Sequence, residues 1–344
     1  MIWLTWRQSR MQALAVAVAM LVFAVALGLT GPNLAQLYTT SGLPACHPPR
    51  DCTGVTTIFL DQMKADAVYP LLYVIGTVSA VLLPALVGAF WGAPLITREI
   101  EAHTLRLVWF QGVTPSHWTA IKLALLGLVS MVSSGILSLM VTWWANPIEN
   151  AGGFPVNQGQ FSRFSPQIFD AQGIAPLAYA LFAFVLGVTV GIIVKRTVPA
   201  MAITLVIFAV VQVVTPTWIR PSLFSPAHLT SPGLTTPLLD NMVVHSSGQL
   251  TVPVNIPNAW IVSNQTVTTS GQVFTLPVVD ACQSGTHYQC AAWLAKQNLR
   301  QLVTYQPASR YWEFQWYEAG IFTALSLLLA ALCILLVRRG HASA

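Results

Sequence analysis

The stretch APLAYALFAFVLGVTVGIIV occupies residues 175–194 and contains no Asp, Glu, Lys, Arg or His. Twenty consecutive apolar residues are enough for an α-helix to cross about 30 Å of hydrocarbon. The whole chain of 344 residues has the same character, because 55% of it is hydrophobic and only 8% is charged. Soluble domains carry about a quarter charged residues. Such a chain cannot cover an ordinary water-facing surface, so the sequence predicts an integral membrane protein.

Five further apolar blocks predict an all-α membrane protein with six transmembrane helices. The expected spans are 13–29, 69–96, 121–144, 175–194, 199–217 and 319–337. Unbroken blocks favour helices over an outer-membrane barrel, in which apolar and polar residues alternate. Pro84 and Pro94 are expected to kink the second span. The first block follows Arg7 and Arg10, and its length and lack of an obvious cleavage site favour a retained helix over a signal peptide.

The basic residues indicate which side of the membrane each connection faces. With a cytoplasmic N-terminus, the inner segments carry nine Lys or Arg against two acids, and the outer segments carry seven against nine. Because short cytoplasmic connections are enriched in Lys and Arg, we expect both termini in the cytoplasm and the protein in the cytoplasmic membrane. The net charge of +5 reflects this orientation and contact with lipid. The scattered basic residues do not indicate nucleic-acid binding.

Four cysteines lie on the side expected to be oxidising, in two pairs that are close in sequence. Cys46 and Cys52 belong to the first outer connection, and Cys282 and Cys290 belong to the last. We predict a disulfide within each pair. A metal site is not expected, because Cys282, His287 and Cys290 would supply only three zinc ligands.

The connection 218–316 is long enough for a small extracytoplasmic segment of mixed α/β structure between the fifth and sixth helices. Val, Thr and Ile punctuated by Pro, Asn and Gly predict short strands over 249–279, and apolar spacing predicts one amphipathic helix over 290–303. The expected division is therefore 1–217 with five spans, 218–316 outside, and 317–344 with the last span and a basic tail.

The shorter connections are expected to be loops on the outer side and surface helices on the inner side. Residues 31–68 and 146–174 form the two outer loops. On the inner side, residues 2–10 and the stretch that begins at Thr97 are each expected to form a short interfacial helix.

Signatures of catalysis do not accompany the spans. The sequence has no phosphate-binding Gly-x-x-x-x-Gly-Lys-Ser/Thr loop, no His-Glu-x-x-His and no Gly-x-Ser-x-Gly. The centres of the expected spans also lack the ionisable residues that ion-driven carriers place at the midplane. We therefore expect neither enzymatic activity nor a cofactor in this chain. Uphill transport would take its energy from another polypeptide.

Three segments resemble the ABC-2-type permeases of bacterial, particularly actinobacterial, ATP-binding-cassette exporters. They are WLTWRQSR (3–10), REIEAHTLRLVWFQGVT (98–114) and YQPASRYWEFQWYE (305–318). The resemblance implies a membrane subunit that forms a homodimer and works with separately encoded ATPase subunits, which bind ATP and Mg²⁺. It also implies that residues near 97–112, which we call the coupling segment, enter a groove of the ATPase subunit.

The resemblance further implies which residues carry these contacts. The ATPase contact would be made by Arg98, Glu99, Glu101, His103, Thr104, Leu105 and Arg106. Relatives often have Gly at the position of His103. The alternative is a plain amphipathic loop whose charges lie among the lipid headgroups.

A solute path is implied between the second and fifth spans of two copies. Its candidate residues are Thr77, Ser79, Thr204, Phe208, Gln212 and Thr215. Helix packing is the alternative role for each of them. An uncharged path favours an amphipathic or hydrophobic solute such as a drug, an antibiotic or a lipid, as in multidrug efflux. The alternatives to an exporter are a lipid extractor or importer, and a non-transporting membrane sensor or assembly factor with a ligand-binding outer segment.

Overall fold

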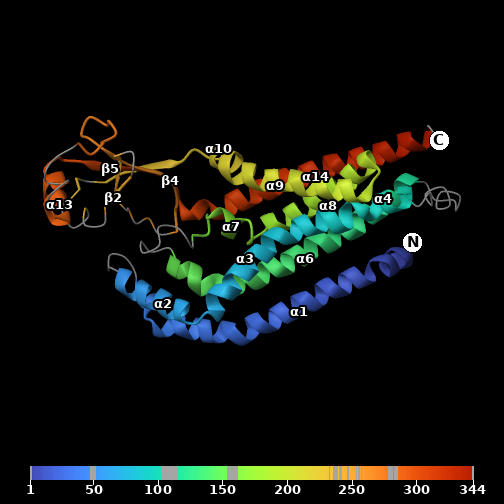
Figure 1. Ribbon diagram of the computed structural model, residues 1–344, viewed down its shortest axis with the longest axis horizontal. Coiled ribbons are helices and arrows are strands. Elements are labelled where there is room, and N and C mark those ends of the chain that lie inside the picture. The colour runs from blue at the N-terminus through green and yellow to red at the C-terminus, as the bar shows by residue number, and fades with distance from the viewer. Residues whose placement is uncertain are drawn as a thin grey trace.

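We describe the protein from a computed structural model of the chain. The structure describes residues 2–46, 52–101, 115–152, 162–231, 233–234, 239, 242–245, 248–252, 254, 256, 258–277, 282 and 286–342. The molecule is elongated, with a helical bundle along its long axis and the strands at one end, which we call the sheet end (Figure 1). The first helix begins and the last helix ends at the opposite end, which we call the terminal end.

Within the part of the chain that the structure describes, six helical stretches are long and apolar enough to cross a membrane, which confirms the predicted number and a multi-pass membrane protein. They are Leu14–Thr40, Val68–Glu101, Ser116–Ala151, Ala175–Val194, Thr197–Ser222 and Ala308–Arg339. The helices that form them are α1 (Ile2–Thr40), α3 (Val68–Val87) with α4 (Pro94–Glu101), α6 (Pro115–Gly152), α8 (Ala175–Val194), α9 (Thr197–Val214) with α10 (Arg220–Ser222), and α14 (Tyr311–Ala342).

Helix α1 differs from the prediction at both ends. The expected interfacial helix over 2–10 is not separate, because Ile2–Thr40 is one continuous helix. At the other end α1 continues through Pro32 for eleven residues beyond the expected boundary at 29, into the supposed outer loop. The reason is tertiary packing: Leu34 is fully buried in a cluster with Leu27 and Trp144, so the helix extends into sequence whose composition is polar.

Both outer connections contain more helix than their composition predicted. Residues 53–65 form α2 (Thr53–Ala65), which packs between α1 and α6. Helix α6 passes Pro147 and ends at Gly152, because Ile148 and Ala151 are buried against α2 and α1. A short helix, α7 (Pro166–Phe169), follows before α8.

Where a kink was expected, the second span contains a π-helical turn, η2 (Gly88–Gly92), between α3 and α4. Pro84 lies inside α3 and Pro94 begins α4, and an extra residue in one turn is a common way to bend a helix. Residues 97–101 of the coupling segment belong to α4, and the rest of the expected surface helix is not tested. Residues 102–114 lie outside the described residues.

Helix α8 lies at the centre of the bundle and contacts α3, α4, α6, α9 and α14. Glycine allows this close packing. A Cβ atom added to Gly88 would lie 2.5 Å from the carbonyl oxygen of Ala183, and one added to Gly191 would lie 2.7 Å from that of Ala93. Small residues at four-residue spacing let membrane helices approach at backbone distance. The signal was present in the sequence as Gly-x-x-x-Gly, on both sides of the contact.

Among the described residues, the sheet end carries two antiparallel sheets and helix α13 (His287–Ala295). The larger sheet has the order β1 (Ala227–Thr230), β5 (Arg300–Gln306), β4 (Trp260–Val267), and the smaller pairs β2 (Val243–Val244) with β3 (Leu250–Thr251). Strands were therefore predicted correctly within 249–279. The helix predicted over 290–303 is wrong in its second half, because α13 (His287–Ala295) ends early and residues 300–306 form the central strand. Asn298 turns the chain with φ 51°, and pairing to strands far away in the sequence overrides the helical spacing.

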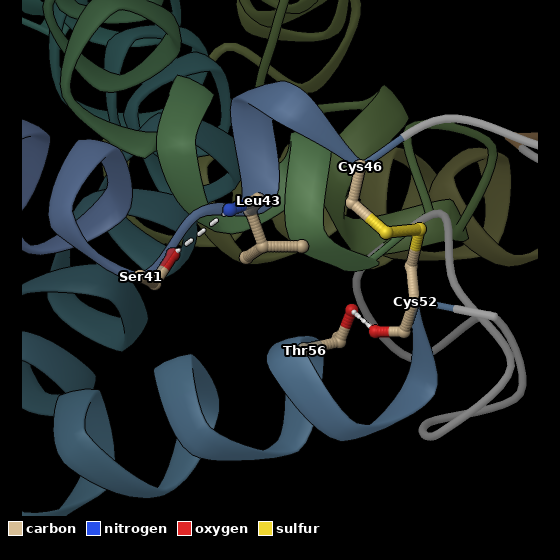
Figure 2. Close-up of a disulfide and its surroundings, with 5 residues drawn as sticks. All are labelled: Ser41, Leu43, Cys46, Cys52 and Thr56. Atoms are coloured by element: carbon tan, nitrogen blue, oxygen red, sulfur yellow. Dashed lines mark hydrogen bonds between the residues drawn. A yellow bond between two sulfur atoms is a disulfide. The ribbon is translucent and has the colours of Figure 1, made fainter. Parts of the chain in front are cut away.

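Both predicted disulfides are present. Cys46 and Cys52 are bonded beside the start of α2, where the hydroxyl of Thr56 donates to the carbonyl of Cys52 at 2.9 Å (Figure 2). Cys282 and Cys290 are bonded at the sheet end. The last two belong to a small apolar cluster of the sheet end around α13 and β3. That cluster gives this part of the chain a core of its own.

Candidate functional sites at the two ends of the bundle

At the terminal end, the acidic side chains of α4 bind other helices of the same chain. Glu99 forms an ion pair with Lys122 of α6, with an Oε1–Nζ distance of 2.8 Å. The Lys122 ammonium also lies 3.8 Å from the ring centroid of Trp118. Only 4% of Lys122 is exposed. This buried ion pair therefore joins the end of the second membrane helix to the start of the third.

Glu101 reaches the first residue of α9. Its Oε1 accepts the backbone N–H of Thr197 at 2.9 Å, and its Oε2 accepts the Thr197 hydroxyl at 2.7 Å. The same hydroxyl lies 3.1 Å from that of Thr97, which donates to the carbonyl of Ala93 at 2.8 Å. One carboxylate therefore joins the second and fifth membrane helices.

The implied ATPase contact is described only in part. Arg98 is exposed, whereas Glu99 and Glu101 make the intramolecular contacts above. The other implied residues, His103, Thr104, Leu105 and Arg106, lie outside the described residues. The contact with an ATPase subunit thus stays a prediction.

Apart from Ser79, the implied path residues fall into two groups. Thr204 and Phe208 are buried inside the chain: the Thr204 hydroxyl donates to the carbonyl of Ala200 at 2.7 Å, and Phe208 packs in the cluster around α8. These two positions fit the packing alternative. Ser79 is partly exposed on α3.

The second group consists of buried polar atoms without a partner. The hydroxyls of Thr77 and Thr215 and both amide atoms of Gln212 have no hydrogen-bond partner among the described residues. Buried polar groups normally have one. In these three residues of the implied path, water, a solute or another chain would have to supply the missing hydrogen-bond partner.

The sheet end holds a cluster of charges that we call the ion cluster: Asp170, Tyr179, Arg220 and Glu318. The Arg220 guanidinium donates to Glu318 through Nη2 at 2.9 Å and through Nε at 3.0 Å, and it also binds Asp170. The Tyr179 hydroxyl donates to Glu318. The four residues come from α8, α10, α14 and the turn after α7, and each is at most 5% exposed.

Phe169 and Gln315 lie next to the ion cluster. The Arg220 guanidinium carbon lies 3.8 Å from the ring centroid of Phe169. Gln315, fully buried on α14, accepts the backbone N–H groups of Ile174 and Ala175 at 3.0 and 2.8 Å and donates to the carbonyl of Gln172 at 3.1 Å. The Gln315 side chain therefore accepts hydrogen bonds from N–H groups at the beginning of α8, which have no acceptor within the helix.

The ion cluster has one cation for two carboxylates. Burial raises the pKa of Asp170 to about 6, an effect that the charge of Arg220 opposes. This cluster was not predicted, because Asp170 and Arg220 fall in two different connections between spans and lie 50 and 98 positions from their ion-pair partners, Arg220 and Glu318. The available signal was weak: single charged residues directly beside apolar blocks.

One comparison with known proteins gave a match. A family model described as ABC-2 membrane transporter related matches residues 17–220, which cover nearly all of the first five membrane helices and end at Arg220. Comparisons with curated proteins and with solved structures gave no significant match.

Proposed function

The chain belongs to the ABC-2 membrane transporter related family, and from this premise we propose that it is the permease of an ATP-driven exporter. The family is one of membrane subunits for transport that are not themselves catalytic. ATP and Mg²⁺ would bind to separate ATPase subunits, which would dock at the terminal end. A second copy of the chain would complete the membrane unit in the cytoplasmic membrane.

The observation that carries this proposal is the position of the coupling segment. Its described part, the end of α4, lies at the terminal end (Figure 1), where it is attached to the third membrane helix through Glu99 and to the fifth through Glu101. An ATPase subunit that moved this segment would act on three membrane helices at once. ATP-driven transport requires that movement of the ATPase subunits change the conformation of the membrane helices.

An amphipathic or hydrophobic solute fits the second and fifth helices best. The unpartnered groups at Thr77, Gln212 and Thr215 are uncharged, and each can make hydrogen bonds without the cost of burying an ion. A small inorganic ion would find few oxygen ligands to replace its water shell. We therefore propose a drug-like compound, an antibiotic or a lipid as cargo.

The orientation can be tested by cysteine labelling in intact cells. The native cysteines form two disulfides or, for Cys333, are buried, so a membrane-impermeant maleimide meets little background. Ser270→Cys at the exposed sheet end should react from outside, and Arg98→Cys should react only after permeabilisation. Reaction of Arg98→Cys in intact cells would contradict a cytoplasmic coupling segment.

The partner can be tested by purification from the native host without cross-linking. We expect an ATPase subunit to co-purify, and its ATP hydrolysis in proteoliposomes to drive accumulation of an amphipathic dye such as rhodamine 6G. Absence of any ATPase, combined with specific ligand binding at the sheet end, would favour the membrane sensor or assembly factor instead.

A further inference from the structure

We propose that Glu101 is a positioning residue that transmits movement of the coupling segment to the fifth membrane helix, by capping the N-terminus of α9. This inference rests on the proposed function. It assigns Glu101 to a contact within the permease, whereas the family resemblance implied a contact with the ATPase subunit.

Helix α9 begins without a cap of its own. Helix α8 ends at Val194, the backbone of Lys195 turns with φ 57°, and Arg196 precedes α9 in an extended conformation with no side-chain hydrogen bond to the helix. The first N–H groups of any helix lack intrahelical acceptors. Here the carboxylate of Glu101, 96 residues away in the sequence, accepts the N–H of Thr197. A negative charge is also favoured at this end of the helix by the helix dipole.

The contact between Glu101 and Thr197 fixes the orientation of α4 relative to the start of α9 as well as the distance between them. Both carboxylate oxygens of Glu101 bind Thr197, one at the backbone and one at the hydroxyl. The hydroxyl of Thr97, one turn before Glu101 on α4, lies against the same Thr197 hydroxyl at 3.1 Å. Two successive turns of α4 therefore hold one residue of α9, so a rotation of α4 has to displace the start of α9.

Helix α4 packs closely on α8. A Cβ atom added to Gly191 near the end of α8 would lie 3.0 Å from Cγ2 of Thr97, and Thr97 is fully buried. Glu101 itself is exposed and fills no part of the core. Replacing Glu101 should therefore leave the packing of α4 on α8 intact while removing its hold on α9.

Helix α9 is less enclosed by its own chain than α8 is. Only 17% of the apolar part of the span that contains α9 is buried within the chain, against 72% for α8. Helix α9 also carries Gln212 and leads to Thr215, whose polar atoms lack partners among the described residues. Movement passed through Glu101 would thus reach the helix that bears the proposed solute contacts.

The first arm of the test measures the cap in the purified permease by amide hydrogen exchange. In Glu101→Ala we expect the amide of Thr197 to exchange about fivefold faster, the effect typical of losing a helix cap. Thr197→Ser keeps both donors and should exchange like the parent. Unchanged exchange in Glu101→Ala would overturn the proposal at its base.

The second arm measures transmission in the complex with the co-purified ATPase subunit. Trp218→Cys, exposed at the sheet end of the fifth span, reports its movement as the change in maleimide labelling rate on adding ATP. We expect ATP to change this rate in the parent, and Glu101→Ala to lose most of the change while retaining the ATPase subunit and ATP hydrolysis. The matched variant Arg98→Ala should instead weaken co-purification of the ATPase subunit.

Three further results would overturn the inference, and they are distinguishable. If Glu101→Ala loses the ATPase subunit as Arg98→Ala does, Glu101 is an ATPase contact. If exchange at Thr197 rises but the ATP-dependent labelling change persists, Glu101 only stabilises the helix end. If the parent shows no ATPase subunit and no response to ATP, the proposed function fails and the inference falls with it, whatever the exchange arm shows about the cap.

Discussion

Replacement of Arg220 by Met should destabilise the fold strongly. Arg220 is 1% exposed, and its guanidinium is the cation that faces the carboxylates of Asp170 and Glu318. Met has similar length and keeps an apolar contact with Phe169, so the change removes a charge without opening a large cavity. Two buried carboxylates would be left facing each other, with the Tyr179 hydroxyl as a remaining donor.

The magnitude follows from the cost of leaving one side of a buried ion pair without its partner, about 3–5 kcal/mol. A second variant separates this cost from any loss of packing. In the triple variant Asp170→Asn, Arg220→Met, Glu318→Gln the cluster contains no charge, so the cost of a buried charge without its partner is removed. The triple variant should therefore be more stable than the single one, although it contains two further substitutions.

The assay is thermal unfolding of the purified protein in detergent at pH 7. With about 2–4 °C in Tm for each kcal/mol in large domains, Arg220→Met should lower Tm by on the order of 10 °C. Arg300→Met, at an exposed position of β5, is the control and should change stability by no more than about 0.5 kcal/mol. The reasoning is refuted if Arg220→Met unfolds with the control, or if the triple variant is as unstable as Arg220→Met alone.

Three further predictions concern the same fold. Because the pKa of Asp170 is about 6 in the folded protein, above its usual value of 3.8, the folded state binds more protons between these values. Stability should then fall as pH rises from about 4 to about 6, and Asp170→Asn should flatten that part of a Tm–pH profile; an unchanged profile would contradict the raised pKa. Gly88→Ala should lower the free energy of unfolding by about 1–3 kcal/mol through overpacking. The control Gly320→Ala, whose added Cβ meets nothing within 4 Å, should not lower Tm. Equal Tm values for the two variants would argue against close packing of α8. Reduction or Ser replacement of Cys282 and Cys290 should remove about 2–3 kcal/mol from the sheet end, and limited proteolysis should then cut there first; cleavage at the parent's rate would show that the bond is not needed.

The features that local sequence predicted well are those with local causes. The span 175–194 was predicted with the bounds that the structure has, because an unbroken apolar run of that length has few other stable conformations. Each disulfide joins cysteines six or eight residues apart, so the short loop itself brings the sulfur atoms together.

Predictions that depended on distant partners were less accurate. The spacing of residues 290–303 is helical, yet residues 300–306 pair with β1 and β4. The end of α1 was placed eleven residues too early, because the contacts that cover Leu34 come from α2 and α6. Composition measures how apolar a segment is and carries no information about which neighbour will bury it.

The amino-acid sequence by itself determined that this is a six-helix membrane protein with two disulfides, since length, hydropathy and short loop closure act along the chain. Only the tertiary structure decided that Arg220 meets Asp170 and Glu318, and that Glu101 caps α9. These contacts join residues 50 to 98 positions apart. Their energies depend on distances in space and on burial, and packing of the helices creates both.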